Sequence, residues 1–330
     1  MEERNDIVIT SYKKEYYADL VDSGYYSLTP FHTYLAPDFY YKVRNLLNID
    51  EIKKFVNRHF FLNNKQITRV AYSKQDQKAV GSITSRKITE RLWGIWSFFV
   101  SPEYRGRRIG ITLGRENFRL LKEMNVERTI AMIAKTNVPS LKAHKSTGLQ
   151  LSDYGYLRSR IFRCERIGPI PEPDFEKTKV RKLHQGEKKQ LFEIFELCVG
   201  KQWRSYLEID QENYLDRIYG PGFWEECGLL SRLAMKKNIL VAESGGKLQG
   251  YAISHAIRFF DYYYALHLFV PVSKGFDAVC RALLIKSFRP PNFKRNNRFS
   301  FIYIGDEKCQ KHLVKLGFET QEFLAPYDLL

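Results

Sequence analysis

Hydrophobic and polar positions in the first 165 residues alternate as short strands and amphipathic helices require. The pattern predicts strands over 6–10, 67–72, 79–86, 92–100 and 128–134, and helices over 13–21, 50–60 and from about 110 onward. The polar run 73–78 separates two of these strand patterns closely enough to predict a β-hairpin. The first half of the chain is therefore expected to combine strands with helices.

The same order of elements returns in the second half, after a proline-rich segment. Residues 168–174 read GPIPEPD, lack periodicity and predict a stiff linker. Beyond them the pattern predicts strands over 179–183, 239–243, 248–255, 262–270 and 299–304, helices over 187–199, 277–288 and 308–316, and a final strand after 317–318. The repetition indicates two tandem domains, which we place at 1–165 and 178–330, with the linker at 166–177.

One stretch, residues 95–121, combines a buried strand, a basic turn and the start of a helix. The strand is expected to end before Pro102, because proline cannot donate the next ladder hydrogen bond. The turn over 105–110 reads RGRRIG, and a helix begins near its last glycine. The helical spacing places these side chains on the inner face of that helix: Ile109, Leu113, Leu120, Leu121 and Met124.

Such a turn favours anion binding. The first amides of a helix lack intrahelical partners, and the helix dipole adds partial positive charge at that end. The guanidinium groups of Arg105, Arg107 and Arg108 supply full charges and paired donors. Glycines at 106 and 110 let a backbone approach closely. The stretch therefore predicts a phosphate or pyrophosphate site; the alternative is a solvated arginine turn on an ordinary strand–helix unit.

The pattern V-x-P-x-Y-R-G-x-x-I-G, from Val100 to Gly110, resembles the acetyl-CoA pyrophosphate loop of the GNAT superfamily of N-acetyltransferases. That loop reads Arg/Gln-x-x-Gly-x-Gly/Ala, and Arg105 and Gly110 match it. Arg108 stands where the family usually has its middle glycine, and the replacement is cationic. The resemblance implies an α/β fold of two tandem GNAT-like domains, each a mixed, largely antiparallel sheet flanked by helices.

The resemblance also implies where acetyl-CoA would lie, namely in a gap between the parallel strands 92–100 and 128–134. Main-chain groups of Phe98 and Val100 would bond the acetyl carbonyl and the pantetheine amides. The loop amides would hold the pyrophosphate, from Arg105 through Gly106, Arg107, Arg108 and Gly110 to Ile111. Transfer in this family is direct, because an amine attacks the thioester while a strand amide stabilises the oxyanion.

A second stretch, NVPSLKAHKSTGL over 137–149, resembles the family's later motif N-x-x-A/S-x-x-x-Y-x-x-x-G-F. The resemblance implies that Asn137 caps a helix or contacts the pantetheine arm, and that Ser140 belongs to the cofactor site. His144 stands where the family most often has the tyrosine that protonates the CoA thiolate. An imidazolium can do that work, because its pKa lies near physiological pH. The alternative is a surface histidine without a chemical role.

The central strand offers no carboxylate to deprotonate the acceptor amine, a task that many family members give to a strand glutamate. Glu90, just upstream of the strand, is the candidate base and would act through a water. His255, Asp261 and His267 of the second domain are further candidates, each with a core or surface role as the alternative. The aromatic-rich segment 25–41 either lines the acceptor pocket or packs a helical hairpin against the sheet.

The second domain departs from the loop pattern. Its corresponding stretch, 270–277, reads VPVSKGFD and lacks the arginines. Asp277 places a negative charge at the helix start, where it would repel a pyrophosphate. The second domain is therefore expected to shape the acceptor site without binding CoA. The insertion 200–230 either walls that site or packs between the domains.

Composition affects mainly the choice of partners. The formal net charge of the 330 residues is +16, and residues 1–164 hold 28 Lys/Arg against 16 Asp/Glu. This excess suits a polyphosphate donor, an acidic acceptor or RNA. Five widely spaced cysteines without a C-x-x-C pair predict free thiols and no zinc site. There is no apparent leader and no apolar run long enough to span a bilayer, so we expect a cytoplasmic protein.

We therefore expect an acetyl-CoA-dependent N-acetyltransferase whose first domain transfers the acyl group directly to a small-molecule or peptide amine. No metal and no membrane partner are expected, and the chain is expected to be a monomer or a homodimer. One alternative is a non-catalytic CoA-binding sensor, suggested by the missing strand glutamate and by His144 and Arg108. The other is an RNA-associated acyl or aminoacyl transferase, suggested by the basic first half.

Overall fold

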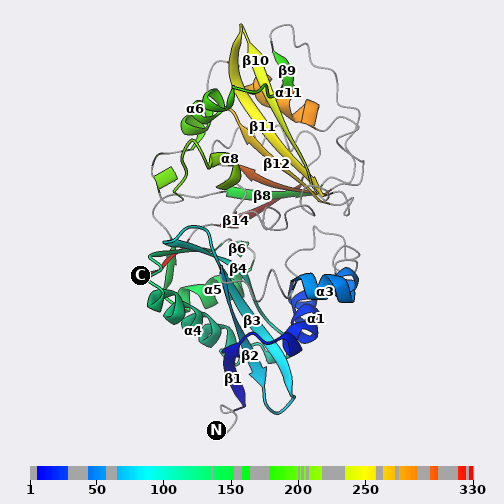
Figure 1. Ribbon diagram of the computed structural model, residues 1–330, viewed down its shortest axis with the longest axis vertical. Coiled ribbons are helices and arrows are strands. Elements are labelled where there is room, and N and C mark those ends of the chain that lie inside the picture. The colour runs from blue at the N-terminus through cyan, green and yellow to red at the C-terminus, as the bar shows by residue number, and fades with distance from the viewer. Residues whose placement is uncertain are drawn as a thin grey trace. The chain divides into compact units, whose positions relative to one another are not determined.

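A computed structural model of the chain places strands and helices in both halves (Figure 1). It describes residues 6–28, 44–56, 65–131, 133–134, 137–151, 158–163, 178–199, 201, 204–205, 208–217, 235–257, 263–271, 275–287, 298–303, 319–324 and 327–329. The predicted linker 166–177, the predicted helix 308–316 and most of the aromatic segment 25–41 lie outside these residues.

The chain forms two compact units, which differ from the predicted domains at their ends. The first unit consists of Met1–Asp153 and Ala325–Leu330, and the second of Tyr154–Leu324. Strand β8 (Arg158–Arg163) was expected in the first domain but pairs within the sheet of the second unit. Strand β15 (Tyr327–Leu329) instead pairs with β7 (Leu149–Leu151) of the first unit. The predicted domain boundaries stay a prediction.

The sheet of the first unit runs in the order β1-β2-β3-β4-β5. Its strands are β1 (Ile7–Ser11), β2 (Gln66–Ser73), β3 (Lys78–Lys87), β4 (Leu92–Val100) and β5 (Arg128–Ala131). Neighbouring strands are antiparallel except for β4 and β5, which are parallel. Of the strand expected over 128–134, the structure describes β5 and the short β6 (Ile133–Ala134), and residue 132 between them lies outside the described residues. This arrangement confirms the mixed, largely antiparallel sheet.

Helices cover both faces of this sheet (Figure 1). One face carries α4 (Ile109–Glu123) and α5 (Val138–Ser146); the other carries the 3-10 turn η2 (Lys14–Tyr16) and α1 (Tyr17–Leu28), with α3 (Asp50–Val56) beside them. The core under α4 consists of Ala71, Val80, Ile83, Tyr104, Ile109 and Leu113. The core under α1 consists of Tyr12, Tyr16, Leu20, Val70 and Ala79. The sheet is therefore buried on both faces.

Helix α4 buries most of the face that its sequence predicts. Ile109, Leu113 and Leu121 are buried, as expected, and Phe118 adds a further buried ring. The prediction for Met124 is wrong, because its side chain is 49% exposed. The helix ends at Glu123, and Met124 is the residue that follows it, so its side chain leaves the helical spacing.

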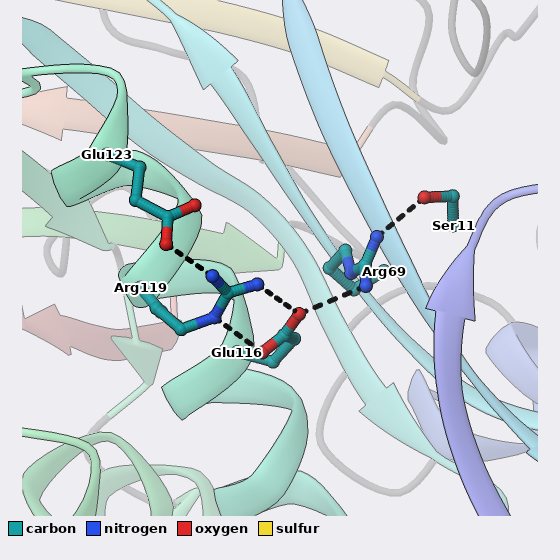
Figure 2. A network of polar contacts seen from close by, with 5 residues as sticks. All are labelled: Ser11, Arg69, Glu116, Arg119 and Glu123. Atoms are coloured by element: carbon teal, nitrogen blue, oxygen red, sulfur yellow. Dashed lines mark hydrogen bonds and ion pairs between the residues drawn. The ribbon is translucent and has the colours of Figure 1, made fainter.

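An ion-pair network joins α4 to β1 and β2 (Figure 2). Arg69 of β2 donates to Ser11 Oγ at 2.6 Å and to Glu116 Oε1 at 3.1 Å. Arg119 of α4 donates to both carboxylate oxygens of Glu116, at 3.0 and 2.9 Å, and also bonds Glu123. These bonds, with that of Arg119 the largest cause, lower the pKa of Glu116. The network thus attaches the outer side of α4 to the sheet.

The two helices on this face approach closely where Gly114 of α4 meets Thr147, the residue after α5. A Cβ atom at Gly114 would lie 2.5 Å from Thr147 Cγ2, well inside van der Waals contact. Thr147 Oγ1 in turn donates to the carbonyl of His144 at 2.6 Å. A glycine at position 114 therefore fixes the distance between α4 and the end of α5.

The second unit builds an equivalent sheet. Its order is β9-β10-β11-β12-β13, followed by β8 and β14. The strands are β9 (Lys179–Lys182), β10 (Met235–Ser244), β11 (Lys247–Ile257), β12 (Tyr263–Phe269), β13 (Arg298–Tyr303) and β14 (Glu319–Leu324). Only β12 and β13 are parallel among the pairs described. Helices α6 (Lys188–Cys198) and α11 (Phe276–Ser287) flank this sheet, and a short helix α8 (Tyr214–Arg217) follows α6 (Figure 1).

Two glycines show how closely the units correspond. A Cβ atom at Gly81 of β3 would lie 2.9 Å from the carbonyl oxygen of Phe99 in β4. A Cβ atom at Gly250 of β11 would lie 3.0 Å from the carbonyl oxygen of Phe269 in β12. The same close approach between the same pair of strands confirms the repeat that element order predicted.

None of the helices that the structure describes is both long enough and apolar enough to cross a membrane.

The Glu116 network predicts a pH-dependent contribution to stability. The pKa of Glu116 is lower in the folded state, so its contribution is complete above the ordinary glutamate pKa of about 4.3 and is lost as pH falls through the folded value. Solvent screens this carboxylate, whose side chain is 24% exposed, so Glu116→Gln should lower the free energy of unfolding at pH 7 by about 0.5–1 kcal/mol. Urea unfolding of both proteins measures this difference in free energy.

The difference between Glu116→Gln and the natural protein should shrink as the pH is lowered from about 6 toward 3. Glu127→Gln is the matched control, because it breaks an exposed pair with Arg91 at 3.6 Å and should change stability by less than about 0.5 kcal/mol. A difference that stays constant with pH would mean that the Glu116 carboxylate contributes nothing as an ion.

The contact between the helices predicts a second effect. Gly114→Ala should destabilise the protein by about 1–3 kcal/mol, although alanine favours a helix by about 1 kcal/mol over glycine, because the new methyl group overlaps Thr147 Cγ2. Thr147→Ser removes that methyl group and keeps the hydroxyl. The double variant Gly114→Ala/Thr147→Ser should therefore recover most of the free energy of unfolding that Gly114→Ala loses, as measured by denaturant titration. If the effects of the two substitutions on this free energy simply add, the contact is contradicted.

Candidate active site

Strand β4 separates from β5 halfway along its length. The two strands pair from Leu92 to Ile95 and, within the described chain, no residue of β4 beyond Ile95 pairs with β5. Ser97 and Ile95 oppose consecutive residues of β3, so Trp96 is an extra residue in β4. Such a bulge bends a strand and increases its twist. The bulge therefore lies where β4 leaves its parallel neighbour.

The main-chain groups of Phe98 and Val100 face the side from which β5 has departed. Ser101 donates its N–H to the carbonyl of Val80 in β3 at 2.8 Å. Main-chain groups of successive strand residues point alternately to the two neighbouring strands. Those of Phe98 and Val100 therefore point toward the gap. Their predicted binding of an acyl group stays a prediction.

The loop that follows β4 contains two residues in the left-handed region. After the 3-10 turn η4 (Pro102–Tyr104), Gly106 has φ +82°. Arg108 has φ 61° and ψ 10° and caps the N-terminus of α4. This conformation costs a residue with a Cβ atom roughly 1 kcal/mol, and glycine adopts it freely. Arg108 is thus strained at the position where the GNAT pattern has its middle glycine.

The three arginines of the loop are exposed and differ in their contacts. Arg105 Nε donates to the carbonyl of Val100 at 3.2 Å, which holds the loop to the end of β4. The guanidinium carbon of Arg107 lies 5.1 Å from the centre of the Tyr104 ring. No described residue hydrogen-bonds the Arg108 side chain. Arg108 is therefore the cation best placed to meet an external anion.

Tyr104, which the sequence reasoning did not single out, anchors the loop to the β2–β3 hairpin. Its ring is buried, and its hydroxyl donates to Asp76 Oδ2 in the hairpin turn. Ser73 Oγ bonds the same oxygen at 2.8 Å, and Lys78 Nζ lies 5.2 Å from the Tyr104 ring centre. The hydrogen bonds of Tyr104 and then of Ser73 lower the pKa of Asp76. The tyrosine of the pattern P-x-Y-R-G was the available signal.

Helix α5 carries the second group of predicted residues. Asn137 caps it, since its side-chain oxygen accepts from the Ser140 N–H at 3.2 Å. His144 Nδ1 lies 2.8 Å from the Ser140 carbonyl oxygen and 3.3 Å from Ser140 Oγ. The His144 side chain is buried with 2% exposure, so the alternative of a surface histidine is wrong. Burial lowers its pKa, and the bond to Ser140 opposes this shift.

The ring of Phe98 joins β4 to both helices. The His144 ring meets it edge to face, with ring centres 4.9 Å apart and planes at 80°. A Cβ atom at Gly110 would lie 3.3 Å from Phe98 Cζ, so this glycine admits the ring under the first turn of α4. Ile111 follows in the same turn and is half-buried. The structure thus brings the loop, α5 and the open edge of β4 together at Phe98.

Glu90 is not brought to this place. It lies in the turn before β4, its side chain is 87% exposed, and it pairs with Lys87. The loop lies at the other end of β4, and nine residues of strand span roughly 25–30 Å. Of the other candidate bases, His267 is buried in β12 of the second unit, Asp261 lies outside the described residues, and the His255 side chain is not described.

Among the described residues, no group of three or more His, Cys, Asp or Glu side chains is arranged to hold a metal ion. Cys198 and Cys280 form no disulfide bond.

A sequence model of the acetyltransferase (GNAT) family matches residues 29–149. Among solved structures, a tandem GNAT protein from the clavulanic acid biosynthesis pathway gives a TM-score of 0.61 at 13% identity over 98% of each chain. A GCN5-related N-acetyltransferase from Sphaerobacter thermophilus gives 0.60 at 12% identity, over 98% of this chain and 96% of the other.

A fungal glucosamine N-acetyltransferase region, part of a multi-domain β-N-acetylglucosaminidase, gives a TM-score of 0.58 at 13% identity, over 98% of this chain and 38% of the other. No curated protein sequence matches the chain significantly. At these identities the structural likeness establishes the fold and leaves the acceptor undetermined.

The family match covers the segment that holds the basic loop, α4 and α5, and the structural matches cover both units. Residues 29–149 therefore match the acetyltransferase (GNAT) family, and the chain has the fold of the tandem GNAT protein over 98% of its length.

Proposed function

We propose that the protein is an acetyl-CoA-dependent N-acetyltransferase whose first unit carries out the transfer. The observation that carries this proposal is the open edge of β4 beyond Ile95, which leads directly into the arginine loop and the N-terminus of α4. A strand edge that has parted from its neighbouring strand suits main-chain bonds to an amide-bearing chain, and the loop offers donors and positive charge to a diphosphate. Acetyl-CoA contains both groups in that order.

The residues present fit such a cofactor. A Cβ atom at Gly106 would meet no atom within 4 Å, so the loop backbone is accessible there. Gly106, Arg107 and Arg108 lie beside the first turn of α4, whose amides are oriented for an anion. When bound, the cofactor supplies an activated acetyl thioester. Phe98 and Val100 would orient it, and an N–H group of β4 would stabilise the oxyanion that develops.

The loop geometry assigns different tasks to the three arginines. Arg105 and Arg107 are engaged with Val100 and Tyr104, so they hold the loop and add long-range charge. Arg108 would contact the diphosphate directly. The strain at Arg108 supports this assignment, because a glycine would suit that backbone better and strained residues concentrate at functional sites.

The acceptor would be an amine on a small molecule or a peptide, and the second unit would shape its site. Asp277 in the first turn of α11 and the lack of arginines in the second loop support the assignment of acetyl-CoA to the first unit only. Asn137 and Ser140 would complete the cofactor site through the cap of α5.

A specific observation favours one alternative, a CoA-binding sensor without transferase activity. Strand β4 carries no carboxylate, and Glu90 lies at the far end of that strand. A sensor would bind acetyl-CoA as proposed but would release no CoA thiol in the presence of any of a broad panel of amines.

The proposal predicts that acetyl-CoA stabilises the protein. At a concentration of about 100 times Kd the gain is about 2.7 kcal/mol, or several degrees in Tm. Arg105→Glu should abolish the shift, because it removes the bond to Val100 and places a negative charge beside the diphosphate. Arg115→Glu is the matched control on the exposed side of α4 and should keep the shift. Absence of any shift at millimolar acetyl-CoA would refute the cofactor assignment.

The strain at Arg108 predicts that two variants, Arg108→Gly and Arg108→Ala, differ in stability but lose the same affinity for acetyl-CoA. Arg108→Gly should be more stable than Arg108→Ala by about 0.5–1 kcal/mol, because only glycine adopts φ 61° without a steric cost. Both variants lose the guanidinium and should bind acetyl-CoA at least about tenfold more weakly. Urea unfolding and calorimetry measure these effects; equal stability would refute the left-handed conformation.

A further inference from the structure

The basic loop is held between two buried residues, Tyr104 and Ile109. Residues 105–108 between them are exposed, whereas both flanking side chains belong to the core under α4. Ile109 is fixed by apolar packing at the start of α4. Tyr104 is 5% exposed and also carries a hydroxyl, and a buried hydroxyl needs a hydrogen-bond partner. The position of the loop therefore depends on the group that holds the Tyr104 hydroxyl.

Asp76, in the turn between β2 and β3, holds that hydroxyl. Tyr104 donates to Asp76 Oδ2, and Ser73 Oγ lies 2.8 Å from the same oxygen. The Asp76 N–H in turn donates to Ser73 Oγ at 3.1 Å, and Asp6 Oδ2 lies 2.8 Å from that hydroxyl oxygen. Asp6 Oδ1 also accepts from the Gln75 N–H at 2.5 Å. The turn and the residue before β1 thus fix the direction of the Asp76 carboxylate.

The ring of Tyr104 fixes the place of two cations. Arg107 Cζ lies 5.1 Å and Lys78 Nζ 5.2 Å from the ring centre, within the range in which the negative face of an aromatic ring attracts a cation. The bond to Asp76 strengthens this attraction, because hydrogen bonds polarise the groups that they join. The hydrogen bonds of Tyr104 and Ser73 lower the pKa of Asp76, and the charges of Lys78 and Arg107 add to this shift. Arg107 is therefore held by Tyr104 and Asp76 together.

Charge and position lead to opposite expectations for Asp76. By charge alone, a carboxylate beside the arginine loop disfavours an anion, so its removal should tighten anion binding. By position, its removal releases the Tyr104 hydroxyl and Arg107, so that binding must order them and the affinity falls. The contacts favour position, because the carboxylate is engaged with Tyr104 and Ser73 and its exposure lets solvent screen its charge.

We propose that Asp76 is a positioning residue for the cofactor. Through Tyr104 it sets where Arg107 and the loop backbone lie, so that a carboxylate promotes the binding of a diphosphate. This inference rests on the proposed function and adds to it a residue that lies far from the loop in the sequence.

Calorimetric titration with CoA tests the sign of the effect. Asp76→Ala removes the partner of the Tyr104 hydroxyl and should weaken CoA binding by about fivefold to tenfold, although it also removes a negative charge. Glu103→Ala is the matched control, because it removes a carboxylate that pairs with Lys78 at 3.4 Å. This control should leave CoA binding unchanged or tighten it by up to about threefold. Binding by Asp76→Ala that is as tight as that of the natural protein, or tighter, would overturn the proposal.

Conservative variants separate the hydrogen bond from the charge. Asp76→Asn keeps an oxygen that can accept from Tyr104 and should lose less than about threefold in affinity for CoA. Tyr104→Phe keeps the ring and loses only the hydroxyl, so it should weaken CoA binding about as much as Asp76→Ala. Because both substitutions break the same bond, Tyr104→Phe/Asp76→Ala should bind CoA within about twofold of either single variant. Losses that multiply in the double variant would contradict the shared bond.

Arg107 provides a readout that a general loss of stability would not change. Arg107→Gln should weaken CoA binding about fivefold in the natural protein, where the ring and the carboxylate hold the guanidinium. In the Asp76→Ala background the same substitution should cost less than about twofold, because Arg107 is no longer held. Equal costs in the two backgrounds would overturn the positioning role. Asp76 and Arg107 are exposed, so these variants should stay folded, and urea unfolding checks that they do.

Titration of the natural protein distinguishes this proposal from the proposed function. If the natural protein does not bind CoA, the cofactor assignment itself fails. If it binds CoA and Asp76→Ala binds equally well, only the positioning role fails.

Discussion

The extra residue at Trp96 is the constraint on which the candidate site depends. Strand β4 stays antiparallel to β3 along its length, whereas among the described residues its parallel pairing with β5 extends only from Leu92 to Ile95, next to this bulge. In a regular parallel ladder, the main-chain groups of Phe98 and Val100 would be hydrogen-bonded to the neighbouring strand. Beyond the bulge, Phe98 and Val100 lie on the part of β4 that runs into the basic loop, where the Val100 carbonyl accepts from Arg105 Nε.

The packing around Phe98 brings helices α4 and α5 together over this part of β4. Gly110 lets the first turn of α4 lie over the ring, and His144 of α5 meets its edge. The Gly114–Thr147 contact fixes the spacing of the two helices, and the Glu116 network holds α4 to the sheet from the other side (Figure 2). Each contact is small, but together they set where the loop amides and the imidazole lie relative to β4.

The second unit has backbone features like those of the first unit at the strand–helix junction, but it lacks the arginines of the first unit's loop. Its strand β12 pairs with the parallel β13 only from Tyr263 to Leu266, although β12 continues to Phe269. A residue with positive φ, Gly275, again precedes the helix that follows. The arginines are absent, and Asp277 occupies the first turn of α11. The second unit thus shares the early end of the parallel pairing and a residue of positive φ just before the helix, but it lacks the positive charge that a diphosphate needs.

The sequence by itself determined the strand–turn–helix unit, its basic loop and the tandem repeat, because Pro102, the arginines and the apolar spacing act locally. The tertiary structure alone decided the bulge at Trp96, the burial of His144 and the exposure of Met124. It also decided the Tyr104–Asp76 anchor and the strands β8 and β15, which pair with segments far away in the chain. These features depend on contacts between distant residues, and local propensity carries no information about such contacts.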